Sequence, residues 1–228
     1  MWMYRSHTDE VADTYAGLMG PIEVTRAGMA RPDGSPNDVD REVFTLFAVM
    51  NENTSPYLKQ NLHRFARPPY PDPDDEDFPE SNLKHSINGY GYGNMPMITM
   101  RKGERVRWYV MSMGTEVDLH TPHWHGNDVT VNGMRMDLVN LLPASMVVAD
   151  MVPDNVGIWL FHCHVNEHLT DRDDHPVSGI AVRVFKAELV RDKGPWRSID
   201  DLEIAVAEYV DWFNHRRPAR RDRPRSAR

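Results

Sequence analysis

The chain has 228 residues, of which 40% are hydrophobic, and a formal net charge of -8 at pH 7. This length is enough to bury one good core, and the negative charge argues against nucleic-acid binding by the chain as a whole. No apolar run approaches the length of a membrane span. Residues 1–5 are followed at once by polar residues, which is not the pattern of a signal peptide. Cys163 is the single cysteine and so has no disulfide partner within the chain.

Short apolar segments separated by turn residues recur along most of the chain. Their apolar, β-branched and aromatic content predicts strands, most clearly at residues 43–50, 104–110, 146–150, 157–165 and 180–185. Asn88-Gly89, Lys102-Gly103 and Asn132-Gly133 mark tight turns between such segments. Many short strands at this spacing predict an all-β fold, a Greek-key β-sandwich. The acidic, proline-rich segment 68–79 is expected to be an exposed loop.

Two windows, residues 120–126 and 162–168, hold six of the eleven histidines and the only cysteine. Successive side chains of a strand point to opposite faces, so His162 and His164 share one side and Cys163 faces the other. The same alternation places His123 and His125 together and His120 opposite them. The seven residues therefore fall into two groups, which are His120, Cys163 and His168 in the first group and His123, His125, His162 and His164 in the second.

The composition of each group indicates copper. Two imidazoles and a thiolate form the trigonal site of blue copper, and four further imidazoles suit additional copper ions. The ordinary alternatives are a cysteine that is only a small buried hydrophobe and histidines that are only core residues. Zinc accepts the same donors, but structural zinc sites favour several thiolates or a C-x-x-C spacing. Seven donor residues at two linked spacings favour copper over these alternatives.

The two windows carry a family resemblance. His120-x-x-His123-x-His125-Gly126 and His162-Cys163-His164-x-x-x-His168 resemble the last-domain signatures of the multicopper oxidases. Residues 33–41, 87–93, 133–137, 137–145 and 150–155 are similar to the ceruloplasmin-like branch of that family. The resemblance covers about residues 1–185 and implies a cupredoxin-like fold.

The resemblance implies a role for each group. His120, Cys163 and His168 would hold a type 1 copper that takes electrons from the substrate. His123 would bind type 2 copper, and His125, His162 and His164 the type 3 pair, as part of a trinuclear cluster that reduces dioxygen to water. Cys163 and His168 are the expected catalytic residues, because electrons would enter through an exposed His168 and leave through Cys163.

Near the second type 1 histidine the sequence departs from the family pattern. The family has a methionine there as a weak axial ligand, whereas this chain has a longer spacer and Ile180 at that position. An aliphatic residue should raise the reduction potential, because it removes a donor to Cu(II). Asp173 and His175 are the alternative axial donors, and either would lower the potential.

The second departure lies at the start of the chain. Residues 1–30 resemble the last strands of a preceding cupredoxin domain, in which the family usually has His-x-His. Here Arg5 stands in place of the first histidine, and His7 alone is a candidate ligand of the trinuclear cluster. The alternative for His7 is a solvated side chain near a terminus. The expected organisation is a remnant over 1–30, a copper-binding cupredoxin domain over 31–185 and a separate element over 186–228.

The last segment differs in character from the rest. Apolar residues at helical spacing over 198–214 predict an amphipathic helix, with Ser198 as its N-cap, and an arginine-rich tail follows. Residues 185–217 resemble the C-terminal end of insertion-sequence transposases, although the catalytic carboxylates of that family have no counterpart here. The alternative is an ordinary C-terminal helix packed on the sandwich, followed by a basic tail.

These features predict a multicopper oxidase that oxidises a small molecule or a metal ion by one-electron steps and delivers the electrons to dioxygen. Glu116, Asp118 and Glu167 lie near the type 1 ligands in sequence and would suit Fe(II). The alternative function is a type 1 copper-binding fragment without oxidase activity, either an electron carrier or a non-functional gene product. The expected partner is a second cupredoxin domain or a homo-oligomer, with no nucleic acid for the cupredoxin part and no membrane. Family members are periplasmic or extracellular, and the sequence itself assigns no compartment.

Overall fold

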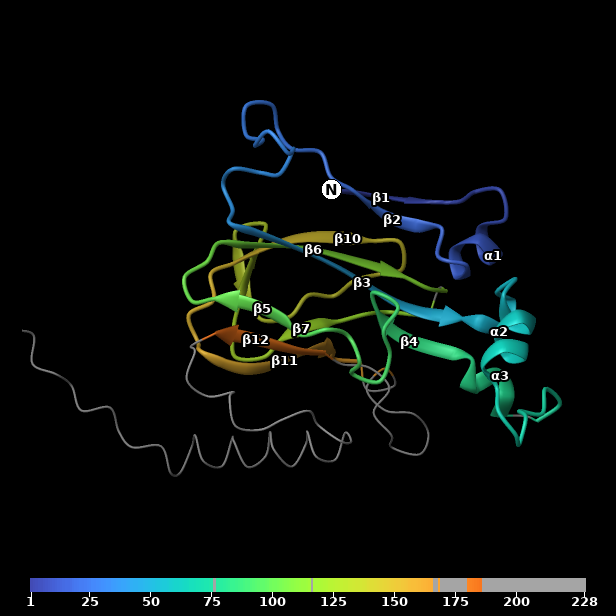
Figure 1. Ribbon diagram of the computed structural model, residues 1–228. Helices are drawn as coiled ribbons and strands as arrows, with labels where there is room; N and C mark the ends of the chain where they lie inside the picture. The colour runs from blue at the N-terminus through green and yellow to red at the C-terminus, as the bar shows by residue number, and fades with distance from the viewer. Residues whose placement is uncertain (76, 116, 166–167, 169–179, 186–228) are drawn as a thin grey trace, which may run out of the picture. The chain divides into compact units, whose positions relative to one another are not determined.

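The computed structural model describes residues 1–185 apart from 76, 116, 166–167 and 169–179 (Figure 1). For residues 180–185 it describes the backbone. The chain divides into two units, Met1–Lys186 and Ala187–Arg228. The second unit, with the helix predicted over 198–214, lies outside the described residues, as do Asp173 and His175.

Two sheets form the body of the first unit (Figure 1). The larger has the strand order β4-β3-β6-β10-β8-β9 and the smaller β5-β12-β11-β7. The larger sheet contains β3 (Arg41–Asn51), β4 (Leu83–Ile87), β6 (Val106–Met113), β8 (Val129–Val131), β9 (Met134–Met136) and β10 (Met146–Met151). The smaller contains β5 (Ile98–Arg101), β7 (Pro122–Trp124), β11 (Gly157–Cys163) and β12 (Ile180–Phe185).

Most neighbouring strands run antiparallel, but β3 with β6 and β12 with β5 are parallel. Parallel neighbours require crossover connections rather than hairpins, so the chain passes between the two sheets as it does in a Greek-key sandwich. The predicted all-β sandwich is confirmed. All five predicted strands are present, although β6 begins and ends later than predicted and β11 ends at Cys163, two residues early.

The core lies where the inner faces of the two sheets meet. The ring of Phe161 from β11 packs edge-on against Phe47 from β3, with centroids 5.4 Å apart, and against Trp108 from β6 at 4.9 Å. Trp108 also meets Trp124 from β7 edge-on at 5.7 Å. Such pairs contribute about 0.5–1.5 kcal/mol each beyond the area they bury. They join the larger sheet to β7 and β11, the two strands that carry the histidine windows.

The Asn-Gly turns appear as predicted. Asn88 and Gly89 both have positive φ, 54° and 78°, between the bridged residues Ile87 and Tyr90. This backbone is typical of the two-residue hairpin turn that Asn-Gly favours. Asn132 and Gly133 make the corresponding turn between β8 and β9, with φ of 50° and 79°.

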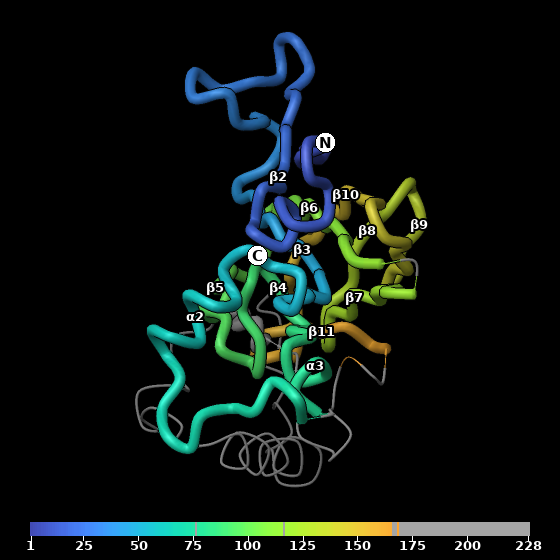
Figure 2. The backbone as a smooth tube through the Cα atoms, turned by 90° about the vertical axis from the view of Figure 1, so that its right-hand side faces the viewer, coloured from blue at the N-terminus to red at the C-terminus, as the bar shows by residue number. Residues whose placement is uncertain are grey.

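The N-terminal segment forms a separate two-stranded sheet from β1 (Trp2–Arg5) and β2 (Met19–Ile22), joined through α1 (Glu10–Tyr15). Figure 2 shows this N-terminal segment beside the larger sheet, near β6 and β10. The Asp9 side chain caps α1 by accepting a hydrogen bond from the backbone N–H of Ala12 at 3.2 Å. Whether this segment derives from a preceding domain stays a prediction.

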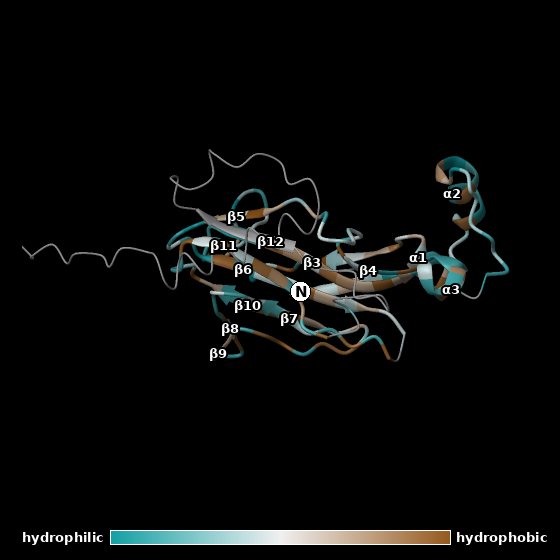
Figure 3. Cartoon of the chain, turned by 90° about the horizontal axis from the view of Figure 1, so that it is seen from below, coloured by the Kyte–Doolittle hydropathy of each residue, from teal (hydrophilic) through white to brown (hydrophobic). Residues whose placement is uncertain are grey.

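Three further helical segments were not predicted from the sequence. They are η1 (Glu52–Thr54), α2 (Leu58–Phe65) and α3 (Asp77–Ser81), all between β3 and β4. Figure 3 shows mainly hydrophilic residues in this connection, whereas hydrophobic residues are concentrated in parts of the strands. The expected exposure of segment 68–79 holds for most of its described residues. None of the helices in the described part of the chain is long and apolar enough to cross a membrane.

Candidate metal centre

The pairing of β11 with β7 brings the two histidine windows together. Their register places His162 opposite His123 and Cys163 opposite Pro122. The backbone N–H of His164 donates to the carbonyl of Thr121 at 2.8 Å, which extends the pairing one residue beyond the strand. Two segments about forty residues apart in sequence therefore present their side chains to the same two faces.

The first group assembles as the strand alternation predicts. Cys163 Sγ lies 3.7 Å from His120 Nδ1 and 3.4 Å from His168 Nδ1, and the three ligand atoms lie within 4.8 Å of one another. All three residues are buried. The backbone N–H of Thr121 also donates to the sulfur at 3.3 Å.

The donor atoms of this group fit a trigonal metal site. Metal–nitrogen and metal–sulfur bonds of about 2.0–2.3 Å at trigonal angles separate nitrogen from sulfur by roughly 3.7 Å, which matches the His120 distance and is slightly longer than the His168 distance. Burial, and then the neighbouring His168, lower the pKa of His120 to about 3. Burial also raises the pKa of the Cys163 thiol. The imidazole therefore stays neutral and ready to ligate, whereas the thiol must lose its proton when a metal binds.

The second group lies on the opposite side of β11. The ligand atoms of His123, His125 and His162 lie within 4.8 Å of one another, and His125 Nε2 faces His162 Nε2 at 2.9 Å. The His164 ring belongs to the same cluster, with its centroid 5.2 Å from that of His123 and 5.7 Å from that of His162. All four predicted residues are brought together.

The hydrogen bond of His162 indicates which of its nitrogens is free to ligate. Its Nδ1 lies 2.7 Å from the carbonyl oxygen of Cys163, and a carbonyl only accepts, so Nδ1 carries the proton. The lone pair of a neutral His162 is then on Nε2, which points at His125. Burial, the largest cause, lowers the pKa of His162 to about 4. Burial also lowers the pKa of His125, with the neighbouring His123 and His164 acting in the same direction.

Gly126 shapes the edge of the second group. It has a φ of +65°, and a Cβ built there would collide with the indole ring of Trp159. Asn155 holds both partners, because its side chain donates to the Gly126 carbonyl at 3.0 Å and its own carbonyl accepts from Trp159 Nε1 at 2.9 Å. The glycine that follows His125 is therefore required by a close ring approach.

The expectation that His168 is exposed is wrong. The residue is only 6% exposed, and its ring contacts those of His120 and His85, each with a centroid 4.7 Å away. His85, on β4, was missed by the sequence analysis. No ligand spacing connects it to either window, and it comes close only through the β3–β4 pairing, in which it lies opposite Val49. Burial lowers the pKa of His85.

Two candidate ligands stay predictions. His7 is exposed, and no ring contact among the described residues joins it to the second group. Ile180 lies opposite Phe161 in the β11–β12 pairing, but its side chain is outside the described part of the chain. The axial position of the first group is therefore not located. Asp118, one of the acids expected near the ligands, accepts hydrogen bonds from the backbone and hydroxyl of Thr115, while Glu116 and Glu167 lie outside the described residues.

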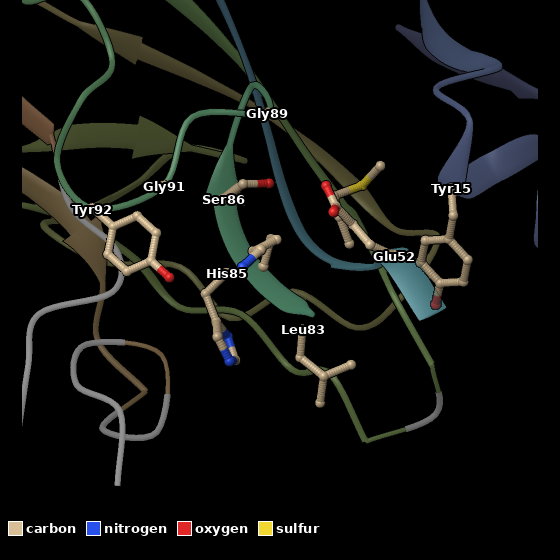
Figure 4. A pocket seen from close by; sticks show the side chains of 10 residues that line it. Tyr15, Glu52, Leu83, His85, Ser86, Gly89, Gly91 and Tyr92 are labelled. Atoms are coloured by element: carbon tan, nitrogen blue, oxygen red, sulfur yellow. The ribbon is translucent and has the colours of Figure 1, made fainter. Parts of the chain in front are cut away.

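A surface pocket of about 290 Å³ lies on the β4 side of the first group (Figure 4). Its lining includes Tyr15, Glu52, His85 and Tyr92. Figure 4 shows Tyr92 on one side of β4 and Tyr15 with Glu52 on the other. Among the residues of this lining, His85 also contacts the first group.

The chain is similar to known proteins in two separate parts of its sequence. Residues 63–172 match the family described as multicopper oxidase, and residues 183–224 match the one described as integrase core domain. Human hephaestin is 43% identical over 173 residues, covering 74% of this chain and 15% of hephaestin. Human ferroxidase HEPHL1 is 41% identical over 170 residues, with 74% and 15% covered. Human ceruloplasmin is 39% identical over 172 residues, with 74% and 16% covered.

The structural comparison agrees with the fold. The crystal structure of the blue copper oxidase from Nitrosomonas europaea matches with a TM-score of 0.58 and 18% sequence identity, covering 86% of this chain and 61% of that chain. The chain spans less than a quarter of the length of the curated relatives named above. The similarity to the ceruloplasmin-like branch and the similarity of the C-terminal segment to integrase-core proteins are both confirmed.

Proposed function

We propose that this chain carries the type 1 copper domain of an enzyme that oxidises its substrate by single electrons and reduces dioxygen to water. The match of residues 63–172 to the family described as multicopper oxidase supports this proposal. One observation carries the proposal. Cys163 places its sulfur in the first group, while its two chain neighbours, His162 and His164, belong to the second. Two metal-ligand groups that share one three-residue segment suit the transfer of electrons between them.

Each residue of the first group has a distinct part in this proposal. His120, Cys163 and His168 would hold type 1 copper, and copper bound there supplies one-electron redox chemistry. The thiolate of Cys163 is kept in place by the N–H of Thr121, and burial of all three side chains excludes water. The backbone of Cys163 is the covalent connection to His162 and His164.

The second group would supply part of the trinuclear centre. His123, His125, His162 and His164 present four imidazoles, with the unprotonated Nε2 of His162 directed at His125. His164 is exposed, and His123 and His125 are half-buried. We propose that a second cupredoxin domain completes this centre with further imidazoles, with His7 as a further candidate ligand.

Ferrous ion is the electron donor that we propose. The support is the name of a relative, because HEPHL1 is called a ferroxidase. Glu52 in the nearby pocket offers a carboxylate oxygen, a ligand type that suits a hard divalent cation. A phenolic donor is the competing substrate class.

The alternative function is a type 1 copper protein that carries electrons without reducing dioxygen. The difference in burial between the two groups favours it, because all three residues of the first group are buried, while in the second group His164 is exposed and His123 and His125 are half-buried. The two functions differ in how the reduced protein behaves in air.

An anaerobic titration tests both functions. Copper-loaded protein should show an intense thiolate-to-Cu(II) band, and Fe(II) should bleach it. When the second cupredoxin domain is present in the sample, readmission of air should restore the band with oxygen consumption in an oxidase, whereas an electron carrier should stay bleached under the same conditions until another acceptor is added. A chain that binds copper but shows no such band contradicts both functions.

A further inference from the structure

His85 lies outside both histidine windows, yet its ring contacts the first group. Its centroid is 4.7 Å from that of His168, with 43° between the planes. The His168 ring also meets that of His120 at the same centroid distance, 4.7 Å, with 46° between the planes. His168 therefore contacts two imidazoles, of which His120 belongs to the ligand group and His85 does not.

Two spaces meet at His85. The first is the surface pocket of about 290 Å³. The second is a narrow gap bordered by Phe47, His120, Cys163 and His168, which has no room for a water molecule. His85 and Ser86 border both spaces. Figure 4 shows them on the central strand of the pocket wall, so they form the wall that separates water in the pocket from the ligand sulfur.

Strand β4 fixes His85 through its backbone. Val49 lies opposite it in the β3–β4 pairing, and the neighbouring Ser86 hydroxyl donates to the Ala48 carbonyl at 3.1 Å. The Nδ1 atom of His85 is buried and has no hydrogen-bond partner among the described residues. Among the described residues no hydrogen bond at Nδ1 orients this ring, and its ring contact is the one with His168.

We propose that His85 is a positioning residue for the type 1 site. Its ring holds the His168 ring with Nδ1 directed at Cys163 Sγ, 3.4 Å away, and it keeps water in the pocket from reaching the sulfur. Groups that orient a ligating histidine affect metal affinity strongly although they never touch the metal. The inference deepens the proposed function and rests on copper binding at this group.

Three variants test the proposal. His85→Ala removes the ring, His85→Phe keeps a ring without nitrogens, and Leu83→Ala is the matched control on the same strand and pocket wall. His85→Ala should weaken Cu(II) affinity by roughly 10–100-fold and shift or broaden the thiolate-to-Cu(II) band. His85→Phe should stay within a few-fold of wild type, and Leu83→Ala should match it.

A second readout needs no metal. Cys163 is the only cysteine and is 2% exposed, so alkylation of metal-free protein by iodoacetamide reports access to its sulfur alone. His85→Ala should react several times faster than wild type, and His85→Phe and Leu83→Ala at the wild-type rate. Circular dichroism and thermal melting would verify that each variant is folded.

The outcomes separate the two ideas. If His85→Ala leaves the thiolate-to-Cu(II) band, the Cu(II) affinity and the alkylation rate of Cys163 at their wild-type values, the role of His85 is overturned. The proposed function then still stands. A His85→Phe variant as impaired as His85→Ala overturns positioning by ring packing. Copper-loaded wild type without the band overturns the proposed function and this inference together.

Discussion

The two histidine groups share strand β11 but differ in how completely the chain encloses them. His120, Cys163 and His168 are 2%, 2% and 6% exposed, and residues from β3 and β4 lie beside them. In the second group only His162 is buried, and His164 is exposed. Strand alternation thus divides the residues of the two histidine windows between a buried site and a partly open one. From this difference we expect the chain to organise the first group by itself and the second group to need a facing surface.

We expect the largest effect from a substitution in the buried first group, compared with one in the partly open second group. Cys163→Ser should abolish the thiolate-to-Cu(II) band, because the hydroxyl replaces the only sulfur among the ligands. His164→Ala removes an exposed imidazole from the second group and should leave the band in place. Visible spectra of both variants at equal copper content would measure the intensity of this band. Equal spectra for wild type and Cys163→Ser would disprove the ligand assignment.

The second expected effect concerns the number of coppers held. Extensive dialysis should leave about one copper per chain, because only the first group brings together a thiolate and two imidazoles that are all buried within the described residues. Ions at the second group should be held at least roughly tenfold more weakly, since missing ligands and the partners that orient them each lower affinity. Inductively coupled plasma analysis of dialysed protein would measure the ratio. Retention of about four coppers with sustained oxygen consumption would contradict this expectation.

The third expected effect is a loss of stability of the metal-free protein in acid. Burial lowers the pKa of His120 from 6.5 to about 3 and that of His162 to about 4. The unfolded chain therefore binds these protons first, so the contribution to stability is complete above pH 6.5 and is lost as the pH falls toward 4 and 3. Both side chains are buried, so the combined effect is several kcal/mol.

Urea denaturation between pH 7 and pH 4 measures that loss. His120→Gln should flatten the pH dependence, because it removes one of the two depressed groups. His63→Gln is the matched control, since His63 is exposed on α2, and it should leave the slope unchanged. A wild-type stability that does not change between pH 7 and pH 4 would contradict the assignment of neutral, buried imidazoles.

Much of the site was predictable because strand alternation is a local property. The parity of residues 120–125 and 162–164 alone assigns each side chain to a face, and the observed groups follow it. His85 was not predictable in this way, because its contact with His168 depends on pairing between distant strands. The exposure of His168 was wrong for the same reason, since the rings that cover it come from outside its own window.

The fold shows the same division between local and distant information. Asn88-Gly89 and Asn132-Gly133 adopt the positive φ values that their residue types favour. By contrast, α2 and α3 lie in a connection rich in proline and charge, where neither helical nor strand periodicity stood out. The parallel pairing of β3 with β6 leaves no signature in either segment, because both read as apolar strands whatever their neighbour.

The smallest expected effect tests the other comparison within the chain, that between the copper-binding part and the C-terminal segment. Residues 183–224 match an integrase core domain, whereas every residue of the two described ligand groups lies between His120 and His168. Deletion from Lys186 onward should therefore leave copper content, the visible band and the urea midpoint unchanged. An internal control is the truncated chain carrying His85→Ala, which should show the same loss of affinity as it does in the full chain. If deletion alone removes the band, the C-terminal segment belongs to the structural core of the copper site, and the interpretation of residues 186–228 as a separate transposase-like element is wrong.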